Sequence, residues 1–386
     1  MEFFNVNNSN ETNQKNKVHI YYIYHEYVKN IQKNNKSCYN NTIFGGIMKK
    51  VRYIFGRIKN MNFKNMFKTI DKIHTLSGKS KVFIFFDMII CALRYQSGYV
   101  DYLLFEMWRL NAKERETVLT RGKNNIFVKY YNNKEFNHIF LNKNEFNSVF
   151  KDYLNREYII LNGKNKDEFN KFLKGKKIIF CKPTSGTHGD SMEKIVVKDF
   201  KGDLYNYLYN KNLVLVEEVV IQCSEMNKLY PYAINTIRII TVNRYDNKQL
   251  VVAAYQRIGN HGYIVDNYNG GGMVVPINEK TGVIEYPAID KLKNIYYKHP
   301  MTNTDIVGFK VPKYKEAVKL ALKASKVVKE IRYVGWDIAI TDKGPVIIEG
   351  NEYPGHDIYQ LPVHRTNNIG VLPKFEEALG KIEDLK

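Results

Sequence analysis

The sequence predicts an α+β protein in which strands paired by hairpins follow a helical region. Strand-like apolar runs begin only after residue 156, and three pairs of them flank short polar turns. Such pairs are typical of hairpins, whereas a doubly wound sheet would place a helix between successive strands. At 386 residues, the chain is long enough for two or three domains.

The helical region is predicted over residues 79–121, where apolar residues recur at helical spacings. A further short helix is expected near residues 145–153. The longest apolar run, 82–93, has twelve residues and contains Asp87. Because it is too short to span a bilayer, we expect it to form a buried helix.

The strands are predicted from compact apolar runs rich in β-branched residues. Their ranges are 176–182, 193–197, 213–221, 235–242, 250–258, 273–277, 283–289, 333–341 and 345–351. The last six should form three hairpins. A long amphipathic helix over 311–331, with Pro312 in its first turn, should separate the second hairpin from the third.

Positive charge is concentrated at the N-terminus. Residues 1–80 contain fourteen Lys or Arg and four Asp or Glu, which is half of the net charge of +20. Such a segment favours polyanions, such as nucleic acid, an anionic membrane surface or an acidic polymer. The plainer interpretation is a solvated, partly disordered basic arm. No RNA-binding motif or zinc pattern indicates a dedicated nucleic-acid binder.

The four cysteines, Cys38, Cys91, Cys181 and Cys223, are widely spaced and include no C-x-x-C pair. This spacing argues against a disulfide framework and for a reducing compartment. The first residues are polar and rich in Asn, without the pattern of a secretory signal. We therefore expect a cytoplasmic protein.

The last predicted hairpin carries a candidate metal site. If residues 342–344 form a three-residue loop, Asp337 lies opposite Glu349. Side chains alternate along a strand, so Asn351 shares the face of Glu349. Three hard oxygen ligands without His or Cys suit Mg²⁺. The alternative, that both acids are ordinary exposed strand residues, is opposed by the apolar character of the two strands.

A candidate phosphate loop follows Lys182, which ends a predicted strand. The sequence P-T-S-G-T-H-G-D-S supplies small residues that let backbone N–H groups approach phosphate oxygens. Its candidate contacts are Ser185, Gly186, Thr187, His188 and Gly189. It is not a Walker A loop, because no G-K-[ST] follows and the next element is a strand. A plain turn remains an equally open interpretation.

Charged residues in or beside apolar strands supply the other candidates. Glu217 and Glu218 end a strand and Glu225 follows, so this segment offers groups to adenine and ribose, or is merely a solvated strand end. Arg238 lies inside an apolar strand and needs an anionic partner. It is either a structural ion-pair residue or a clamp on phosphate. Arg257, in the next predicted strand, is a weaker candidate for the same two roles.

The order of these motifs resembles the ATP-grasp superfamily, and in detail the sugar-transfer-associated ATP-grasp proteins of polysaccharide loci. The order is Lys-Pro with a glycine loop, V-E-E-x-x-I, N-T-I-R, a glycine cluster, G-W-D and E-G-N. The resemblance covers roughly residues 85–375 and implies an ATP-grasp fold with two α+β lobes clasping ATP. Together with the charge and the helical periodicity described above, it predicts four domains: a basic, partly disordered extension over 1–78, which lies outside the resemblance, a helical region over 79–140, a small lobe over 141–222 and a large lobe with the metal site over 223–386.

The resemblance also implies a role for each candidate residue. Asp337, Glu349 and Asn351 match Mg²⁺ ligands, and Lys143, Lys182 and the loop 184–191 match phosphate contacts. The hinge Glu218–Ile221, which includes Val219 and Val220, matches the adenine site, with Glu225 at the ribose position, and Glu217 beside it is a further nucleotide-binding candidate. Arg238 matches an arginine near the transferred phosphate, and Arg257 is a second catalytic candidate. His356 and Asp357 lie in the loop that would face the acceptor.

The implied activity is that of an ADP-forming, ATP-dependent carboxylate–amine ligase that uses Mg²⁺ and proceeds through an acyl-phosphate. An acidic sugar or polysaccharide precursor and an amino compound are the expected substrates. The general base stays open among His188, His261 and His356. The alternatives are an ATP-grasp kinase acting on a hydroxyl, and a non-catalytic polyanion-binding protein. The basic N-terminus is a possible contact for a membrane or another polyanion.

Overall fold

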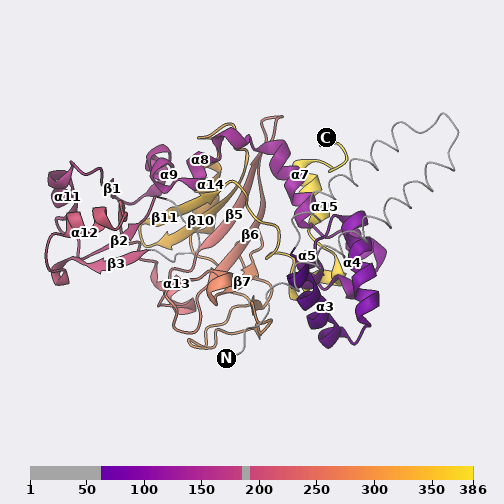
Figure 1. The fold of residues 1–386 in the computed structure, drawn as a ribbon. Coiled ribbons are helices and arrows are strands. Elements are labelled where there is room, and N and C mark those ends of the chain that lie inside the picture. The colour runs from indigo at the N-terminus through magenta and orange to yellow at the C-terminus, as the bar shows by residue number, and fades with distance from the viewer. Residues whose placement is uncertain (1–61, 185–191, 386) are drawn as a thin grey trace, which may run out of the picture. The chain divides into compact units, whose positions relative to one another are not determined.

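The computed structural model describes residues 62–184 and 192–385, which form a helical region and two antiparallel sheets (Figure 1). The helical region contains α3 (Phe63–Ser77), α4 (Lys81–Tyr95), α5 (Tyr99–Leu104), η1 (Met107–Arg109), α6 (Ala112–Glu116), α7 (Arg121–Tyr131), η2 (Lys134–Phe136), α8 (His138–Leu141), α9 (Lys143–Val149) and α10 (Lys151–Leu154). Side-chain caps start several of them: Ser80, Asn111, Thr120 and Asn142 each accept a first-turn N–H.

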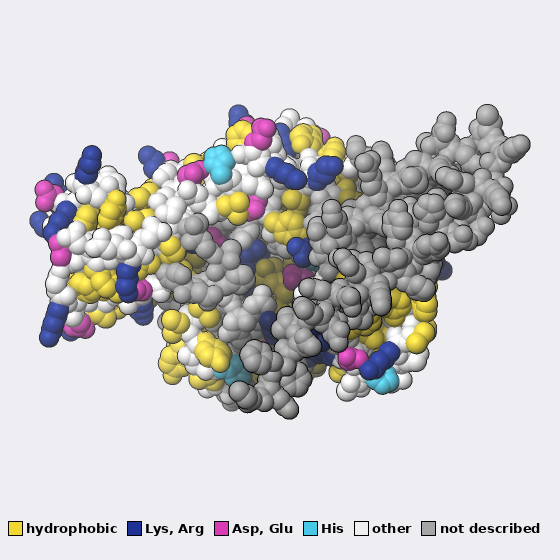
Figure 2. All heavy atoms as spheres, viewed as in Figure 1, with side chains coloured by type: hydrophobic (Ala, Val, Ile, Leu, Met, Phe, Trp, Pro, Cys, Tyr) yellow, Lys and Arg dark blue, Asp and Glu magenta, His cyan; other side chains and the backbone are white. Residues whose placement is uncertain are grey.

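The small sheet has four strands in the order β1-β4-β2-β3. They are β1 (Tyr158–Ile160), β2 (Ile178–Lys182), β3 (Glu193–Val196) and β4 (Leu215–Glu218). Helices α11 (Lys166–Leu173) and α12 (Leu204–Asn210) bury Phe169 and Leu208 against Ile179 and Val216, with η3 (Val197–Asp199) between β3 and α12. Figure 2 shows charged side chains of both signs interspersed over this lobe, at the left.

The large sheet has seven strands in the order β11-β10-β5-β6-β7-β8-β9. They are β5 (Ile237–Asn243), β6 (Gln249–Ile258), β7 (Met273–Pro276), β8 (Ala288–Asp290), β9 (Ile295–Tyr296), β10 (Tyr333–Thr341) and β11 (Gly344–Asn351). The other elements of this part are α13 (Ser224–Leu229), η4 (Tyr268–Gly270), α14 (Tyr314–Ala324), η5 (Pro362–His364), η6 (Thr366–Asn368) and α15 (Leu372–Leu379).

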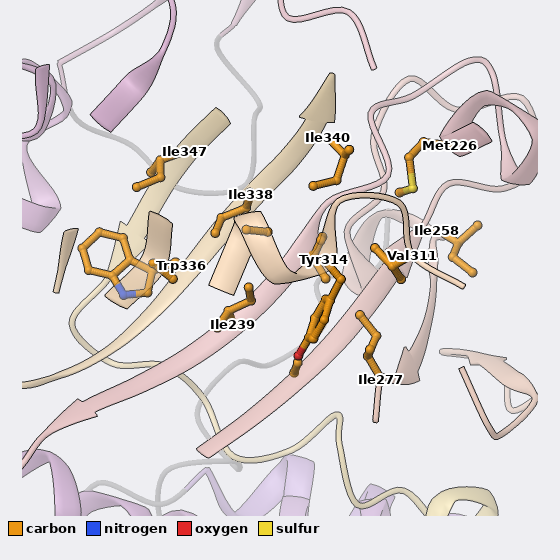
Figure 3. Packing of buried hydrophobic residues seen from close by; sticks show 14 of the residues in the cluster. Met226, Ile239, Ile258, Ile277, Val311, Tyr314, Trp336, Ile338, Ile340 and Ile347 are labelled. Carbon is orange, nitrogen blue, oxygen red and sulfur yellow. The ribbon is translucent and has the colours of Figure 1, made fainter. Parts of the chain in front are cut away.

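Both faces of the large sheet are covered, which explains why its strands are apolar on both sides. On one face α14 packs against the strands, and Figure 3 shows Tyr314 of this helix among core residues such as Ile239 and Ile338. On the other face, Phe127 of α7 and Phe375 of α15 pack with residues of β5, β6 and β7. The polar site described below shares this second face, near the β10–β11 edge.

The β10–β11 hairpin confirms the predicted pairing of Asp337 with Glu349, but by a different route. Thr341 pairs with Gly344, so the loop has two residues rather than the three that we predicted. That register alone would place Asp337 opposite Ile348. A β-bulge between Asp337 and Ile338 inserts one residue on β11 and returns Glu349 to the position opposite Asp337.

Three other expectations need correction. The helical region begins at Phe63, earlier than residue 79. The helix predicted over 311–331 is only Tyr314–Ala324. Its C-terminal carbonyls are taken by side chains from the large sheet, because Asn243 and Gln249 donate to the carbonyls of Ser325 and Leu322.

The third correction concerns α4, which is not a buried helix. Its inner face is buried, but several of its large apolar side chains reach solvent. Among the described residues, no helix combines the length and apolar character needed to cross a membrane. The cysteines Cys91, Cys181 and Cys223 are buried and carry free thiols, while Cys38 and the rest of residues 1–61 lie outside the described residues.

Candidate functional site

The centre of the candidate site is a buried carboxylate held by two arginines on adjacent strands. Asp337 of β10 pairs with Arg238 of β5, and strand alternation puts Arg257 of β6 on the same face. The guanidinium of Arg238 donates to both carboxylate oxygens of Asp337, at 2.8 Å for Oδ2, and Arg257 donates to Oδ2 at 2.9 Å. Burial alone would raise the pKa of Asp337, but the two arginine charges lower this pKa to about 2.

Glu349 and Asn351 complete the oxygen set predicted from the sequence. The Asn351 amide lies 3.4 Å from the Glu349 carboxylate. Glu349 forms no ion pair with the residues that the structure describes. Although this residue is exposed at the rim, withdrawal of its carboxyl from water and the facing charge of Asp337 both raise its pKa. A cation bound between the two carboxylates would remove this repulsion.

The small sheet carries a second buried ion-pair network. The Nζ of Lys182 lies 2.5 Å from Glu217 Oε2, and the guanidinium of Arg156 lies 2.7 Å from Glu217 Oε1. Asn147 donates to the same carboxylate at 2.7 Å. Burial would raise the pKa of Glu217, but Lys182 and Arg156 lower it to about 2. Glu217 is therefore buried, and Lys182 and Arg156 share its carboxylate, whereas its predicted contact with a nucleotide stays a prediction.

Arg156 also links this network to β11, the strand that carries the candidate metal ligands Glu349 and Asn351. Its guanidinium donates to the carbonyls of Ile347 and Ile348 on β11, at 3.2 Å for the second. Ile348 is the residue that the β-bulge leaves without a partner on β10. The guanidinium therefore satisfies carbonyls at the bulge and ties the small sheet to the strand that carries Glu349.

Lys143 lies where the two networks approach each other. It is the first residue of α9, and its backbone N–H donates to Thr184 just after β2. Burial and the positive charge of Lys182 lower its pKa, while Glu349 and Glu217 act in the opposite direction. Residues 185–191 lie outside the described residues, so the predicted contacts Ser185, Gly186, Thr187, His188 and Gly189 have no described positions.

The segment after β4 connects the two sheets. Glu218 is exposed at the end of β4, and Val219 and Val220 follow it without regular structure. Next, Cys223 donates its backbone N–H to Ile340 of β10 at 2.8 Å. Glu225 does not join the Asp337 group: it lies beside Cys223 and Asp342, with their candidate ligand atoms within 4.8 Å of one another.

Comparison with known proteins identifies the family. Residues 170–370, slightly more than half of the chain, match the family described as sugar-transfer associated ATP-grasp. The chain belongs to this family. No curated protein matches this ATP-grasp chain.

Solved structures of ATP-grasp ligases are similar to the chain. The ATP-grasp ligase PsnB with its minimal precursor has 12% identity and a TM-score of 0.39, covering 66% of this chain and 64% of that chain. VanG D-Ala:D-Ser ligase from Enterococcus faecalis has 12% identity and a TM-score of 0.37, covering 64% and 61%. D-alanyl-alanine synthetase A from Vibrio cholerae has 15% identity and a TM-score of 0.38, covering 63% and 61%. The chain thus spans less than two thirds of the length of each.

The donor set of this ATP-grasp protein fits a magnesium ion. Asp337, Glu349 and Asn351 offer only hard oxygens, which is the chemistry that Mg²⁺ prefers. Glu349 lies opposite Asp337 in the strand pair and forms no ion pair with a described residue, so a cation could bind between the two carboxylates. Oδ1 of Asp337 accepts from Arg238 alone and retains acceptor capacity, whereas Oδ2 already accepts from both arginines.

Sequence reasoning missed residues that partner the predicted ones. Arg156 and Asn147 hold Glu217, and Asp266 accepts hydrogen bonds from Thr236 at 2.6 and 2.7 Å. Burial raises the pKa of Asp266, and the nearby Arg257 opposes this. The only local signal for Asp266 is its place just before the glycine cluster. Arg156 has no comparable signal, because its partners lie 61 and about 190 residues away.

His356, in the loop that we expect on the acceptor side, pairs with Asp101 of α5. His356 Nε2 is 3.0 Å from Asp101 Oδ1, and both side chains are buried. The backbone N–H of Arg121 donates to Asp101 at 2.8 Å and fixes that carboxylate. The Pro354 carbonyl accepts from Arg238 at 3.4 Å, so the loop that carries His356 contacts the arginine pair.

Proposed function

We propose that this protein is an ATP-dependent, ADP-forming carboxylate–amine ligase. The observation that supports this most directly is the convergence of cationic side chains from one lobe with carboxylates from the other. Lys143 and Lys182 come from the part assigned to the small lobe (141–222), and Asp337 and Glu349 from the large lobe (223–386). Catalysis of phosphoryl transfer requires mainly this kind of positioning and charge neutralisation.

In this proposal, Lys143 and Lys182 bind the phosphates of ATP, together with the loop 184–191. The hinge that includes Glu218, Val219 and Val220 contacts the adenine, since it is the segment that joins the two sheets. Glu225 is retained as a candidate ribose contact. Glu217 is reassigned to positioning Lys182, because its carboxylate is already held by two cations.

Asp337, Glu349 and Asn351 would hold Mg²⁺, which neutralises phosphate charge when it is bound. Arg238 and Arg257 keep Asp337 ionised and fixed, so that its oxygens face the ligand site in one orientation. The same arginines supply positive charge near the transferred phosphate.

The proposed reaction has two steps. A substrate carboxylate oxygen attacks the γ-phosphorus, the bond to the ADP oxygen breaks, and an acyl-phosphate forms. An amine nitrogen then attacks the acyl carbon, the carbon–oxygen bond breaks, and inorganic phosphate leaves as the amide forms. His356 is the base that we assign to the amine proton, because Asp101 orients its imidazole and its loop contacts Arg238.

The substrate class is proposed from the family and from charge. A family associated with sugar transfer and a net charge of +20 both favour an acidic sugar or polysaccharide precursor as the carboxylate donor, with an amino compound as acceptor. We propose a cytoplasmic site of action, because both ATP and reduced cysteines are available there.

The test uses γ-labelled ATP, Mg²⁺ and mixtures of acidic sugars with amino acids. Wild-type protein should release labelled inorganic phosphate and form an amide. The turnover of Glu349→Gln should be at least about 100-fold lower than that of wild type. Glu316→Gln, on the exposed side of α14, is the matched control and should retain it.

Two outcomes would overturn the proposal. Label retained on a hydroxyl product would show a kinase. Equal turnover of wild type and Glu349→Gln would show that the metal assignment is wrong.

A further inference from the structure

Helix α4 presents a continuous stripe of large apolar side chains to solvent. Each of six residues on one helical face is between 40% and 67% exposed. This α4 stripe consists of Val82, Phe83, Phe86, Ile89, Ile90 and Leu93. The spacing follows one side of a helix over three turns. Figure 2 shows hydrophobic side chains at the surface in the region that α3 and α4 occupy in Figure 1.

The opposite face of α4 is fixed by a buried charge, so the helix cannot roll to hide the stripe. Nη1 and Nη2 of Arg115 each donate to the Asp87 carboxylate at 2.7 Å, and the hydroxyl of Tyr102 donates to it at 2.6 Å. Ile84 and Cys91 are fully buried on the same inner face. The helix thus buries an acidic residue and exposes phenylalanine and isoleucine, the reverse of the usual distribution.

The area of the stripe limits what can cover it. About half of six large side chains gives an exposed apolar area on the order of 500 Å². This is at the upper end of what monomeric proteins expose, and such patches mark interaction surfaces. A stable dimer interface buries about 800 Å² per partner, so the stripe alone is small for a second copy of this chain.

The part of the chain that carries the stripe is positively charged. Between residues 63 and 100 the chain has six Lys or Arg and two Asp or Glu. Both acids are already paired, Asp71 with Lys81 and Asp87 with Arg115. The exposed cations are at both ends of α4 and along α3: Lys64, Lys68, Lys72, Lys81 and Arg94. A two-fold contact between copies would bring these like charges together, whereas an anionic surface would attract them.

We propose that the α4 stripe docks on an anionic lipid surface, with α4 lying in the plane of the interface. An apolar stripe flanked by lysine and arginine has the two components of such binding, namely apolar insertion and attraction to acidic headgroups. This surface is separate from the candidate ATP site. It would bring the protein to substrates that are themselves held at a membrane.

The experiment is flotation of the full chain with vesicles of phosphatidylcholine alone or with 30 mol% phosphatidylglycerol (roughly the anionic content of charged membranes). Wild-type protein should float with the anionic vesicles. Phe86→Ser/Ile90→Ser should reduce the partition coefficient by about 30-fold, since two half-exposed apolar side chains no longer insert. Leu141→Ser/Leu292→Ser, at two exposed apolar sites elsewhere, is the matched control and should float like wild type.

Four results would overturn the proposal. Wild type could remain with the unbound fraction, or float equally with neutral vesicles. Phe86→Ser/Ile90→Ser could bind as tightly as wild type, which would assign binding to another basic segment. Finally, the substitution could convert a dimer into a monomer in analytical ultracentrifugation, which would show that a second copy covers the stripe. An unchanged melting temperature confirms that the variant is folded.

Discussion

Replacing Glu217 by glutamine tests whether the small-lobe network is a fold-stabilising ion pair that also positions Lys182. The substitution keeps the shape of the side chain but removes the charge between Lys182 and Arg156. Removing one partner of a buried ion pair typically costs about 3–5 kcal/mol, because the remaining charges are left desolvated.

The lowered pKa of Glu217 arises from the same contacts and determines how this loss depends on pH. Interactions in the folded protein lower this pKa from 4.5 to about 2. A group with a lowered folded-state pKa contributes stability above its unfolded pKa, and this stability is lost as pH falls towards the folded value. The shift corresponds to about 3 kcal/mol at pH 7, in agreement with the estimate for a broken buried pair.

The assay is urea unfolding followed by far-UV circular dichroism at several pH values. We expect Glu217→Gln to unfold with a free energy about 3 kcal/mol lower than wild type at pH 7, and the difference to shrink by roughly half near pH 3. Glu218→Gln is the matched control, because its exposed side chain ends the same strand. A loss under about 1 kcal/mol at pH 7, or a loss equal to that of the control, would refute the reasoning.

Three further expectations follow from single contacts. Glu349→Gln should leave the free energy of unfolding unchanged or raise it by up to about 1 kcal/mol, because it removes repulsion from Asp337; a clear loss by urea unfolding would contradict this. Burial lowers the pKa of His364 to about 4, so the unfolded state takes up a proton at a higher pH than the folded state. The free energy of unfolding should therefore fall by about 3 kcal/mol between pH 6.5 and 4. In His364→Gln this part of the pH dependence should disappear. Gly350→Ala should lower the free energy of unfolding by about 1–3 kcal/mol, because the new Cβ would lie 2.9 Å from the Phe146 ring. An unchanged melting temperature would contradict this and show that the ring moves aside freely.

The strands were predictable because their signal is local. Alternation and turn residues place β5, β6, β10 and β11 within a few residues of their observed bounds. The pairing of Asp337 with Glu349 was also predicted, but two errors cancelled: the loop is one residue shorter than expected, and the bulge adds one residue. The bulge was not predictable, because Arg156, which satisfies its carbonyls, is almost 200 residues away in the sequence.

The helices have two features that the local sequence pattern does not determine, namely which side of α4 is covered and where α14 ends. An apolar run in α4 indicates a helix but does not say which side is covered, and the buried pair of Asp87 with Arg115 decides that orientation. In α14 the amphipathic pattern continues past Ala324, yet the helix ends where Asn243 and Gln249 take its last carbonyls. In both cases a tertiary contact overrides the periodicity.

The charged residues of the candidate site were predicted one at a time as ligands, whereas the structure pairs most of them with one another. Lys182 is held by Glu217, and Asp337 is held by Arg238 and Arg257. An unpaired buried charge costs several kcal/mol, so these partners allow the site to be charged in the folded protein before any ligand binds. Binding of a phosphate or a cation then redistributes contacts within a network that is already in place. A substitution in this network should therefore change stability and ligand affinity together. The rim residue Glu349, which lacks an ion-pair partner among the described residues, is where the two effects should separate.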